Sequence, residues 1–200
     1  PTRGRPVSLE MRLFPYRLDE LEGTATYRRG RVDWQNVVAH HERSVYSVGS
    51  GSWQVTADGG WQCNLSNVSA DRLAMSRDLI AAIPPALQTV LDKLQPTGAI
   101  GLYNGSFTFA KSPQVQGLAA AWDVTVECQQ AALQCAVPLR GINGGVRIVG
   151  RSDGRNAYVS GEFGLDTLLC KDVQLTNVRG PFWADATHFL AGEPACKQQN

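Results

Sequence analysis

Histidine, which binds metals and transfers protons, is rare in this sequence and poorly placed for either task. The three histidines are His40, His41 and His188. His40 and His41 are neighbours in a stretch that reads as a β-strand, so their side chains are expected on opposite faces. They therefore cannot form one metal-binding edge, and we expect no metal site.

The five cysteines also lack the spacing of a zinc site, because no two of them form a C-x-x-C pair. Cys128 and Cys135 flank one predicted turn and could form a disulfide bond. The alternative is that both are small buried apolar residues. The cysteines are Cys63, Cys128, Cys135, Cys170 and Cys196.

No motif with a known catalytic mechanism is present. The sequence contains no GxSxG, HExxH, P-loop or Rossmann pattern. Asp and Glu are scattered over turns and polar faces, although two carboxylates could still meet in space. We therefore expect neither an enzyme nor catalytic residues, and no cofactor.

Composition points to a β protein with no excess charge. Hydrophobic residues make up 43% of the 200 residues, charged residues 18%, and the net charge is about +1. This charge does not favour a nucleic-acid partner. The 20 glycines and 10 prolines suit many short strands and turns. No apolar run approaches 18 residues, so we expect no membrane span in this stretch. The chain begins at Pro1 and ends in a polar tail, so we expect it to be a piece of a longer protein.

Apolar and polar residues alternate along most of the chain, the pattern of strands with one apolar face. The strands expected on this basis cover residues 7–14, 21–27, 31–41, 45–49, 53–57, 61–65, 100–103, 106–109, 122–129, 133–139, 146–151, 155–163, 172–178 and 181–189. Ser152-Asp153-Gly154 reads as a turn between two of them.

Two hairpins have a predicted register. A loop at residues 58–60 would place Trp53 opposite Leu65 and Val55 opposite Cys63, with all apolar residues on one side. A tight turn at Asn104-Gly105 would place two apolar pairs on one face. These pairs are Leu102 with Phe107 and Ile100 with Phe109.

Residues 76–95 interrupt the β pattern. Ser76 or Asp78 could cap a short helix that Pro84 ends, and Pro85 could begin a second one. The second helix carries apolar residues at helical spacing over 87–94.

Short sequence patterns recur and indicate structural repetition. The run Val32-x-Trp34-x-Asn36-Val37 resembles both 61–68 and 173–178, and Leu21-Glu22-Gly23 resembles 139–141. The five tryptophans could stack on sugars if exposed, whereas rings on the apolar side of a strand would belong to the core or cover the apolar face. Arg28, Arg29 and Arg31 crowd one turn and could meet anionic headgroups or simply face solvent.

The fold expected is mainly β: a long antiparallel meander sheet, curled or groove-like, with one short helical insertion at about 76–95. Its apolar face needs a cover, which can be a second sheet, the helix or a ligand. We divide the chain into a linker and first strand (1–20), a first β-groove repeat with the helical segment (21–96), and a second repeat with a polar tail (97–200).

The stretch from Leu21-Glu22-Gly23 to Val48-Gly49-Ser50-Gly51, with Arg31 to His40 between them, resembles the AsmA-like family of Gram-negative-type bacteria, which includes TamB and YhdP. Residues 144–150, 174–181 and 94–98 are similar to it as well. The resemblance covers most of residues 20–190 and rests on loose glycine, asparagine and hydrophobic spacings.

This resemblance implies a repeating β-groove in the periplasm or cell envelope, along which phospholipid acyl chains move between the inner and outer membranes or support outer-membrane assembly. It implies an inner-membrane anchor in a segment outside this chain, and no catalytic residues. The five cysteines and the helical insertion depart from the family pattern. The residues that we expect to line the groove are Trp53, Val55, Leu65, Ile100, Leu102, Phe107, Phe109, Val124 and Val126.

Two alternatives stay open. A closed β-sandwich or jelly roll would bind carbohydrate or protein and would bury its apolar faces against each other. A purely structural β-domain would bind no ligand.

Overall fold

In the computed structural model, the described residues form one antiparallel sheet of eleven strands, each paired with the next along the chain. The structure describes residues 7–11, 14–73, 75–82, 88, 91–92, 94–114, 117–134, 137–185 and 188–192. The strand order runs from β1 to β11 without a crossover, so the sheet is an open meander. The predicted fold class is confirmed.

The strands are long for a meander. Their bounds are β1 (Leu9–Met11), β2 (Phe14–Arg28), β3 (Arg31–His41), β4 (Ser44–Val55), β5 (Trp61–Asp71), β6 (Thr97–Lys111), β7 (Ala119–Leu133), β8 (Leu139–Ser152), β9 (Ala157–Cys170), β10 (Val173–Ala184) and β11 (Phe189–Ala191). The helix α1 (Arg77–Ala82) lies between β5 and β6, and the described residues 88, 91–92 and 94 are helical as well.

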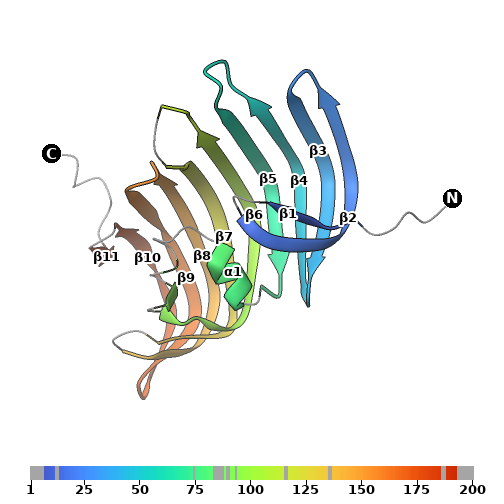
Figure 1. Cartoon of the computed structure of the whole chain (residues 1–200). Coiled ribbons are helices and arrows are strands. Elements are labelled where there is room, and N and C mark those ends of the chain that lie inside the picture. The colour runs from blue at the N-terminus through green and yellow to red at the C-terminus, as the bar shows by residue number, and fades with distance from the viewer. Residues whose placement is uncertain are drawn as a thin grey trace.

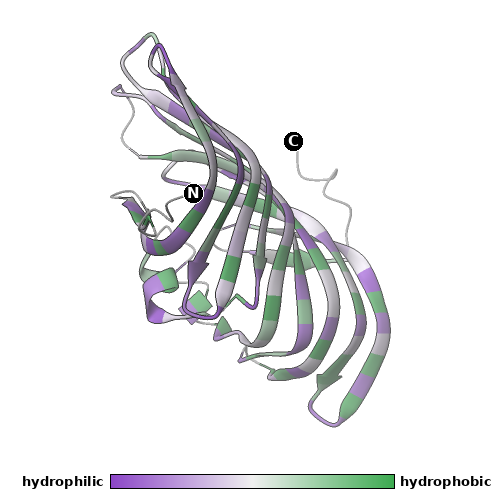
Figure 2. Cartoon of the chain, turned by 90° about the vertical axis from the view of Figure 1, so that its right-hand side faces the viewer, coloured by the Kyte–Doolittle hydropathy of each residue, from purple (hydrophilic) through white to green (hydrophobic). Residues whose placement is uncertain are grey.

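The sheet is curled, and α1 lies on its concave side (Figures 1 and 2). The beginning of β2 bends out of the sheet and, with β1, crosses in front of its neighbours on that same side (Figure 1). We call the hairpin tips at 28–31, 55–61 and 111–119 the upper rim, and the opposite ends of the strands the lower end.

A line of left-handed backbone positions bends the first half of the sheet. Asn36, Asn67 and Asn104 have φ angles of 51°, 54° and 52° in the middle of β3, β5 and β6. Asparagine tolerates this conformation better than most residues. On β4 the matching position is Gly49, whose place opposite Asn67 leaves no room for a Cβ atom. Each strand thus gains one extra residue at the same level, and the register of β3–β4 and β4–β5 stays continuous.

A second line crosses the later strands. Gly98, Gln130, Gly144 and Asn177 have φ angles of 102°, 53°, 124° and 53°. Asn143 stabilises this line: its Oδ1 accepts a hydrogen bond from the Gln130 backbone at 2.9 Å, and its Nδ2 donates to Thr167 Oγ1 at 2.8 Å. Register shifts in the β7–β8 and β8–β9 pairs fall here.

The sequence repeats coincide with these lines. Asn36, Asn67 and Asn177, which end the three similar runs, share the left-handed conformation. Gly23 and Gly141, which end the other similar pair, also have positive φ angles. The repeated asparagines and glycines therefore mark a recurring bend.

The predicted hairpin at Asn104-Gly105 is wrong. Residues 97–111 form one continuous strand, β6, so Leu102 and Phe107 lie on the same strand and do not pair across a turn. An Asn-Gly pair signals left-handed backbone, which a tight turn and a bulge both use. Here only Asn104 is left-handed, and the chain bends without reversing.

The register predicted for the 53–65 hairpin is wrong by two residues. Trp53 pairs with Cys63 and Val55 with Trp61. The loop is longer than predicted, because the Thr56 amide donates to the Gly60 carbonyl at 3.0 Å and closes the turn there. A shift of two residues keeps side chains on their predicted face.

Several predicted strands have different bounds. The strands at 45–49 and 53–57 are one strand, β4, and the strands at 172–178 and 181–189 are largely one strand, β10, which continues through Pro181. The return strand predicted at 133–139 is wrong, because β8 begins only at Leu139, directly after Pro138. The predicted strand at 7–14 is only the three-residue β1 followed by the start of β2.

The first predicted helix is confirmed in position. The Ser76 hydroxyl accepts a hydrogen bond from the Leu79 amide at 3.2 Å and caps α1. The predicted second helix lies partly outside the described residues. Leu94, near its end, is joined to the sheet by its carbonyl, which accepts from the Gln134 amide at 2.7 Å.

Candidate functional site

One face of the sheet is apolar from β2 to β10. Residues directly opposite each other in an antiparallel pair point to the same face, so the paired residues form continuous rows across the strands. One such row is Ala25, Trp34, Gly51, Leu65, Phe107, Trp122 and Gly150. The row above it is Tyr27, Val32, Trp53, Cys63, Phe109 and Ala120.

This apolar face is the concave one. Leu79 and Ala82 of α1 are buried against Tyr16, and the half-buried Tyr46 packs on the same cluster. Tyr46 pairs with Ala39 and Ala70, which belong to a lower row of this face. The helix therefore marks the apolar side, and it lies in the concavity (Figure 2).

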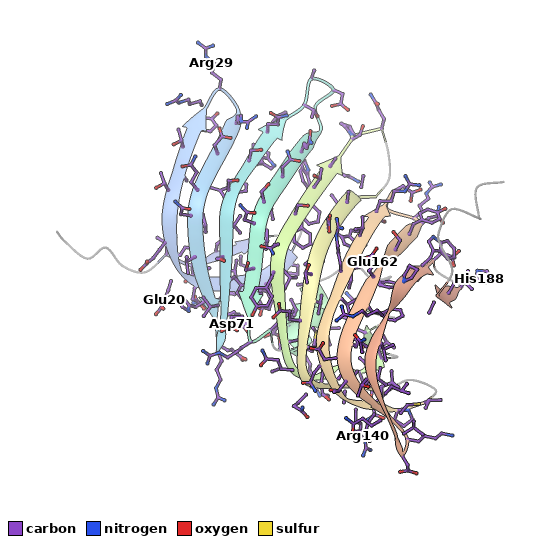
Figure 3. All side chains as sticks on the ribbon, turned by 180° about the vertical axis from the view of Figure 1, so that it is seen from behind. Glu20, Arg29, Asp71, Arg140, Glu162 and His188 are labelled. Carbon is purple, nitrogen blue, oxygen red and sulfur yellow. The ribbon has the colours of Figure 1, made fainter. Side chains whose placement is uncertain are left out.

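The opposite, convex face is polar. Arg147 forms a two-pronged ion pair with Asp123, with distances of 3.0 and 2.7 Å. Figure 3 views the sheet from this side and shows Glu162 there. Arg147, Glu162 and Arg179 line a shallow hollow of about 480 Å³. Because Arg147 binds Asp123 and Arg179 donates to Asn177 at 2.7 Å, these arginines already have partners.

The lower end of the concave face is covered by the chain itself. Tyr16 is only 2% exposed, its hydroxyl lies 2.7 Å from that of Tyr46, and burial raises its pKa above the usual range of a phenol. Under the later strands, Ala131, Ile142 and Leu168 form a second buried cluster.

His41, the last residue of β3, packs against this cover. Its ring is tilted against that of Tyr16, with a centroid distance of 4.1 Å. Its Nδ1 lies 2.7 Å from the Arg17 carbonyl oxygen, which can only accept, so Nδ1 carries the proton. His41 therefore points to the concave side, as its alternation with His40 predicts.

The upper part of the concave face is open. Its aromatic side chains are half-exposed, and Tyr27 and Val55 are 71% and 54% exposed. By contrast, seven of the nine buried apolar residues in the described part of the sheet lie towards the lower end, below the upper rows: Tyr16, Ala39, Ala70, Ile100, Ala131, Ile142 and Leu168. Half of the face is thus a core, and the other half is a solvent-accessible apolar floor.

Large rings lie flat on this floor because glycines face them. A Cβ atom on Gly51 would lie 2.0 Å from the Trp34 ring, and one on Gly150 would lie 2.3 Å from the Trp122 ring. Phe182 lies over Gly161 in the same way. The absence of a side chain at these glycines therefore leaves the space that the rings occupy.

The nine predicted groove residues all lie on the concave face. Seven belong to the open part or its border: Trp53, Val55, Leu65, Leu102, Phe107, Phe109 and Val126. Ile100 and Val124 are 7% and 6% exposed, so a ligand could not contact them without movement of the groove.

Trp34, Trp61, Trp122 and Phe163 also lie on this face and were absent from the predicted set. Trp122 has the alternation signal of its neighbour Val124. Trp34 shares the spacing of the repeated run, which could have placed it. Nothing local to Phe163 shows that its ring contacts Gly180 across the sheet.

Three cysteines of the described chain, Cys63, Cys128 and Cys170, are free and half-buried. Burial raises the pKa of Cys63 and of Cys128, which keeps both as neutral thiols at neutral pH. The predicted partner Cys135 lies outside the described residues. Within the described part of the chain, no three His, Cys, Asp or Glu residues gather as they would around a metal ion.

Comparisons with protein families, with curated proteins and with solved structures found no match to this chain. Among the residues that the structure describes, no helix has the length and apolar character needed to cross a membrane.

Proposed function

We propose that the open part of the concave face binds the acyl chains of phospholipids, and that the chain is a groove segment of an AsmA-like protein that transfers lipid between membranes or supports outer-membrane assembly. The observation that carries this proposal is the half-exposed aromatic and aliphatic floor, which is continuous across strands β2 to β10.

Energetics support an apolar occupant. Exposed apolar surface costs about 25 cal/mol per Å², and contiguous patches beyond several hundred Å² are unusual on soluble monomers. Acyl chains can fill such a surface without directional hydrogen bonds. The polar convex face, with its Asp123–Arg147 pair, suits contact with water.

The closed sandwich that underlies the alternative needs a second sheet. The described strands form one sheet, and among the described residues α1 and the beginning of β2 pack on the lower end of its apolar face. Carbohydrate binding by the half-exposed tryptophans is the part of this alternative that does not need a second sheet.

A matched pair of variants tests the proposal. Leu65 faces the groove, and its neighbour Ser66 points to the convex side. The purified protein is incubated with phosphatidylglycerol in mild detergent, and native mass spectrometry measures the bound fraction. We expect Leu65→Asp to lose at least tenfold in bound lipid, and Ser66→Asp to keep it, with circular dichroism unchanged in both.

Wild-type protein that carries no lipid and melts cooperatively as a monomer would contradict the proposal. So would equal binding by Leu65→Asp and Ser66→Asp.

A further inference from the structure

The tryptophans of the open groove are arranged as a belt along the upper rim. Four of the five tryptophans, Trp34, Trp53, Trp61 and Trp122, lie in the top three concave rows. Tyr27, Phe107 and Phe109 complete this belt, and the last two rings are stacked at a centroid distance of 6.2 Å. The fifth, Trp183, pairs with Ser160 and points to the convex face.

The rows below the belt are mainly aliphatic. One row is Val37, Val48 and Val68, and its continuation is Val124 and Ile148. The row below them includes Ala70, Leu102, Val126 and Val146. The concave face therefore changes from indole-rich at the rim to mainly aliphatic towards its middle.

The indole N–H groups of the belt have no acceptor in the described part of the chain, where no hydrogen bond joins any of the four to another residue. An indole nitrogen can only donate. A groove filled with plain hydrocarbon would leave these donors unsatisfied, which is unfavourable. An occupant that brings oxygen acceptors to the level of the belt would satisfy them.

Tryptophan and tyrosine gather at the same depth in membrane proteins, where an apolar ring body meets a polar edge. The belt has the same arrangement, because its ring bodies lie on the apolar floor and the aliphatic rows begin below them at the level of Val48.

The rim beyond the belt is basic at its first tip. Arg28 and Arg29 are exposed at the β2–β3 turn, and Figure 3 shows Arg29 projecting from it. Arg28 and Arg31 pair with each other on the convex side of this tip, where Asp33 lies 2.8 Å from Arg31. Arg29 thus stands at the tip over which a headgroup would leave the groove.

We infer that the groove takes ester-linked lipids in one orientation, with the ester carbonyls at the tryptophan belt, the acyl chains on the aliphatic rows, and the headgroup leaving over the upper rim. This inference rests on the proposed lipid-binding function and specifies its substrate class. It distinguishes diacyl lipids from hydrocarbons and from lipids without carbonyl acceptors.

The test uses two lipids with the same phosphoglycerol headgroup and chains of the same length and unsaturation. One carries ester-linked oleoyl chains and the other ether-linked oleyl chains. The full chain is given both in equal amounts in mild detergent, and native mass spectrometry measures the bound ratio. We expect the wild-type protein to prefer the ester by about three- to tenfold, as one or two net hydrogen bonds would give.

The variant Trp53→Phe/Trp122→Phe keeps aromatic rings but removes two N–H donors. We expect its ester preference to fall below about twofold, whereas Trp183→Phe, on the convex face, keeps the wild-type ratio. Circular dichroism confirms that all three proteins are folded.

Binding of both lipids without an ester preference, or a preference that survives in the double variant, would overturn the inference and leave the lipid-binding function standing. Binding of neither lipid would overturn both.

Discussion

The covered and open parts of the concave face share one sheet and one alternating pattern, yet they differ in what lies above them. At the lower end, Tyr16, Leu79 and Ala82 pack together and Ala131, Ile142 and Leu168 are almost fully buried. At the upper rim, Trp34, Trp53 and Phe107 remain half-exposed. The same type of strand thus provides a core in one half and an open apolar floor in the other. Over the first of the two buried clusters, the cover is α1 together with the beginning of β2.

The largest expected effect comes from the same substitution in the two halves. Leu168→Ala leaves a cavity in the buried cluster, and we expect it to lower the free energy of unfolding by about 2–4 kcal/mol. Leu65→Ala removes a half-exposed side chain and should cost about 1 kcal/mol or less. Urea denaturation measures both. Equal losses would mean that the upper rows are as well packed as the lower ones.

A second prediction concerns the bend that all the central strands share. Valine is strained in the left-handed region, so we expect Asn104→Val to lower the free energy of unfolding by about 1–3 kcal/mol. Asn104→Gly should be nearly neutral, because glycine adopts this conformation freely. Thermal melts of the two variants measure the difference. A valine variant as stable as the wild-type protein would show that the bend does not depend on Asn104.

The third prediction tests the cover at high pH. Tyr16 stays protonated in the folded state, whereas its phenol ionises near pH 10 in the unfolded state. The contribution of Tyr16 to the free energy of unfolding should therefore be constant below about pH 10 and fall above it. Tyr16→Phe removes the hydrogen bond between the Tyr16 and Tyr46 hydroxyls, which should lower the free energy of unfolding by about 1 kcal/mol. Because the variant has no phenol at this position, its free energy of unfolding should fall less steeply above pH 10. Stability measured against pH would contradict this if both proteins showed the same slope.

The smallest effect is expected on the convex face. Asp123→Asn breaks the exposed pair with Arg147 and should change the free energy of unfolding by less than about 1 kcal/mol, and by even less at high salt. Lipid binding should not change. A larger loss, measured by urea denaturation at two salt concentrations, would mean that the polar ladder supports the curvature of the sheet.

Alternation alone predicts the face of a residue well and its pairing partner poorly. Between the bends, the concave position of the predicted residues follows from period two, which an error of two residues in register preserves. Leu102 and Phe107 are an odd number of residues apart on β6, so they share the concave face only because the bulge at Asn104 shifts the alternation by one residue. The Asn104-Gly105 prediction failed because the same left-handed preference serves a bulge inside a strand. The cover over Ile100 and Val124 could not be predicted, because it depends on how the sheet curls and on segments distant in sequence.

The belt shows the same limit in the candidate site. Trp53 and Trp122 can be placed on the apolar face from their neighbours, but their gathering with Trp34 and Trp61 at one rim depends on the register of four strand pairs. The bends at Asn36 and Asn67 were visible as a repeated Asn-Val pair, although their meaning required the backbone angles.

The most direct test of the central claim, that the open part of the concave face holds acyl chains, is fluorescence quenching by phosphatidylglycerol with brominated chains. Two single-tryptophan proteins are compared, one with Trp122 on the concave face and one with Trp183 on the convex face, all other tryptophans being replaced by phenylalanine. We expect saturable quenching of Trp122 and little of Trp183. Equal quenching of both, or none of Trp122 in a folded protein, would contradict the claim.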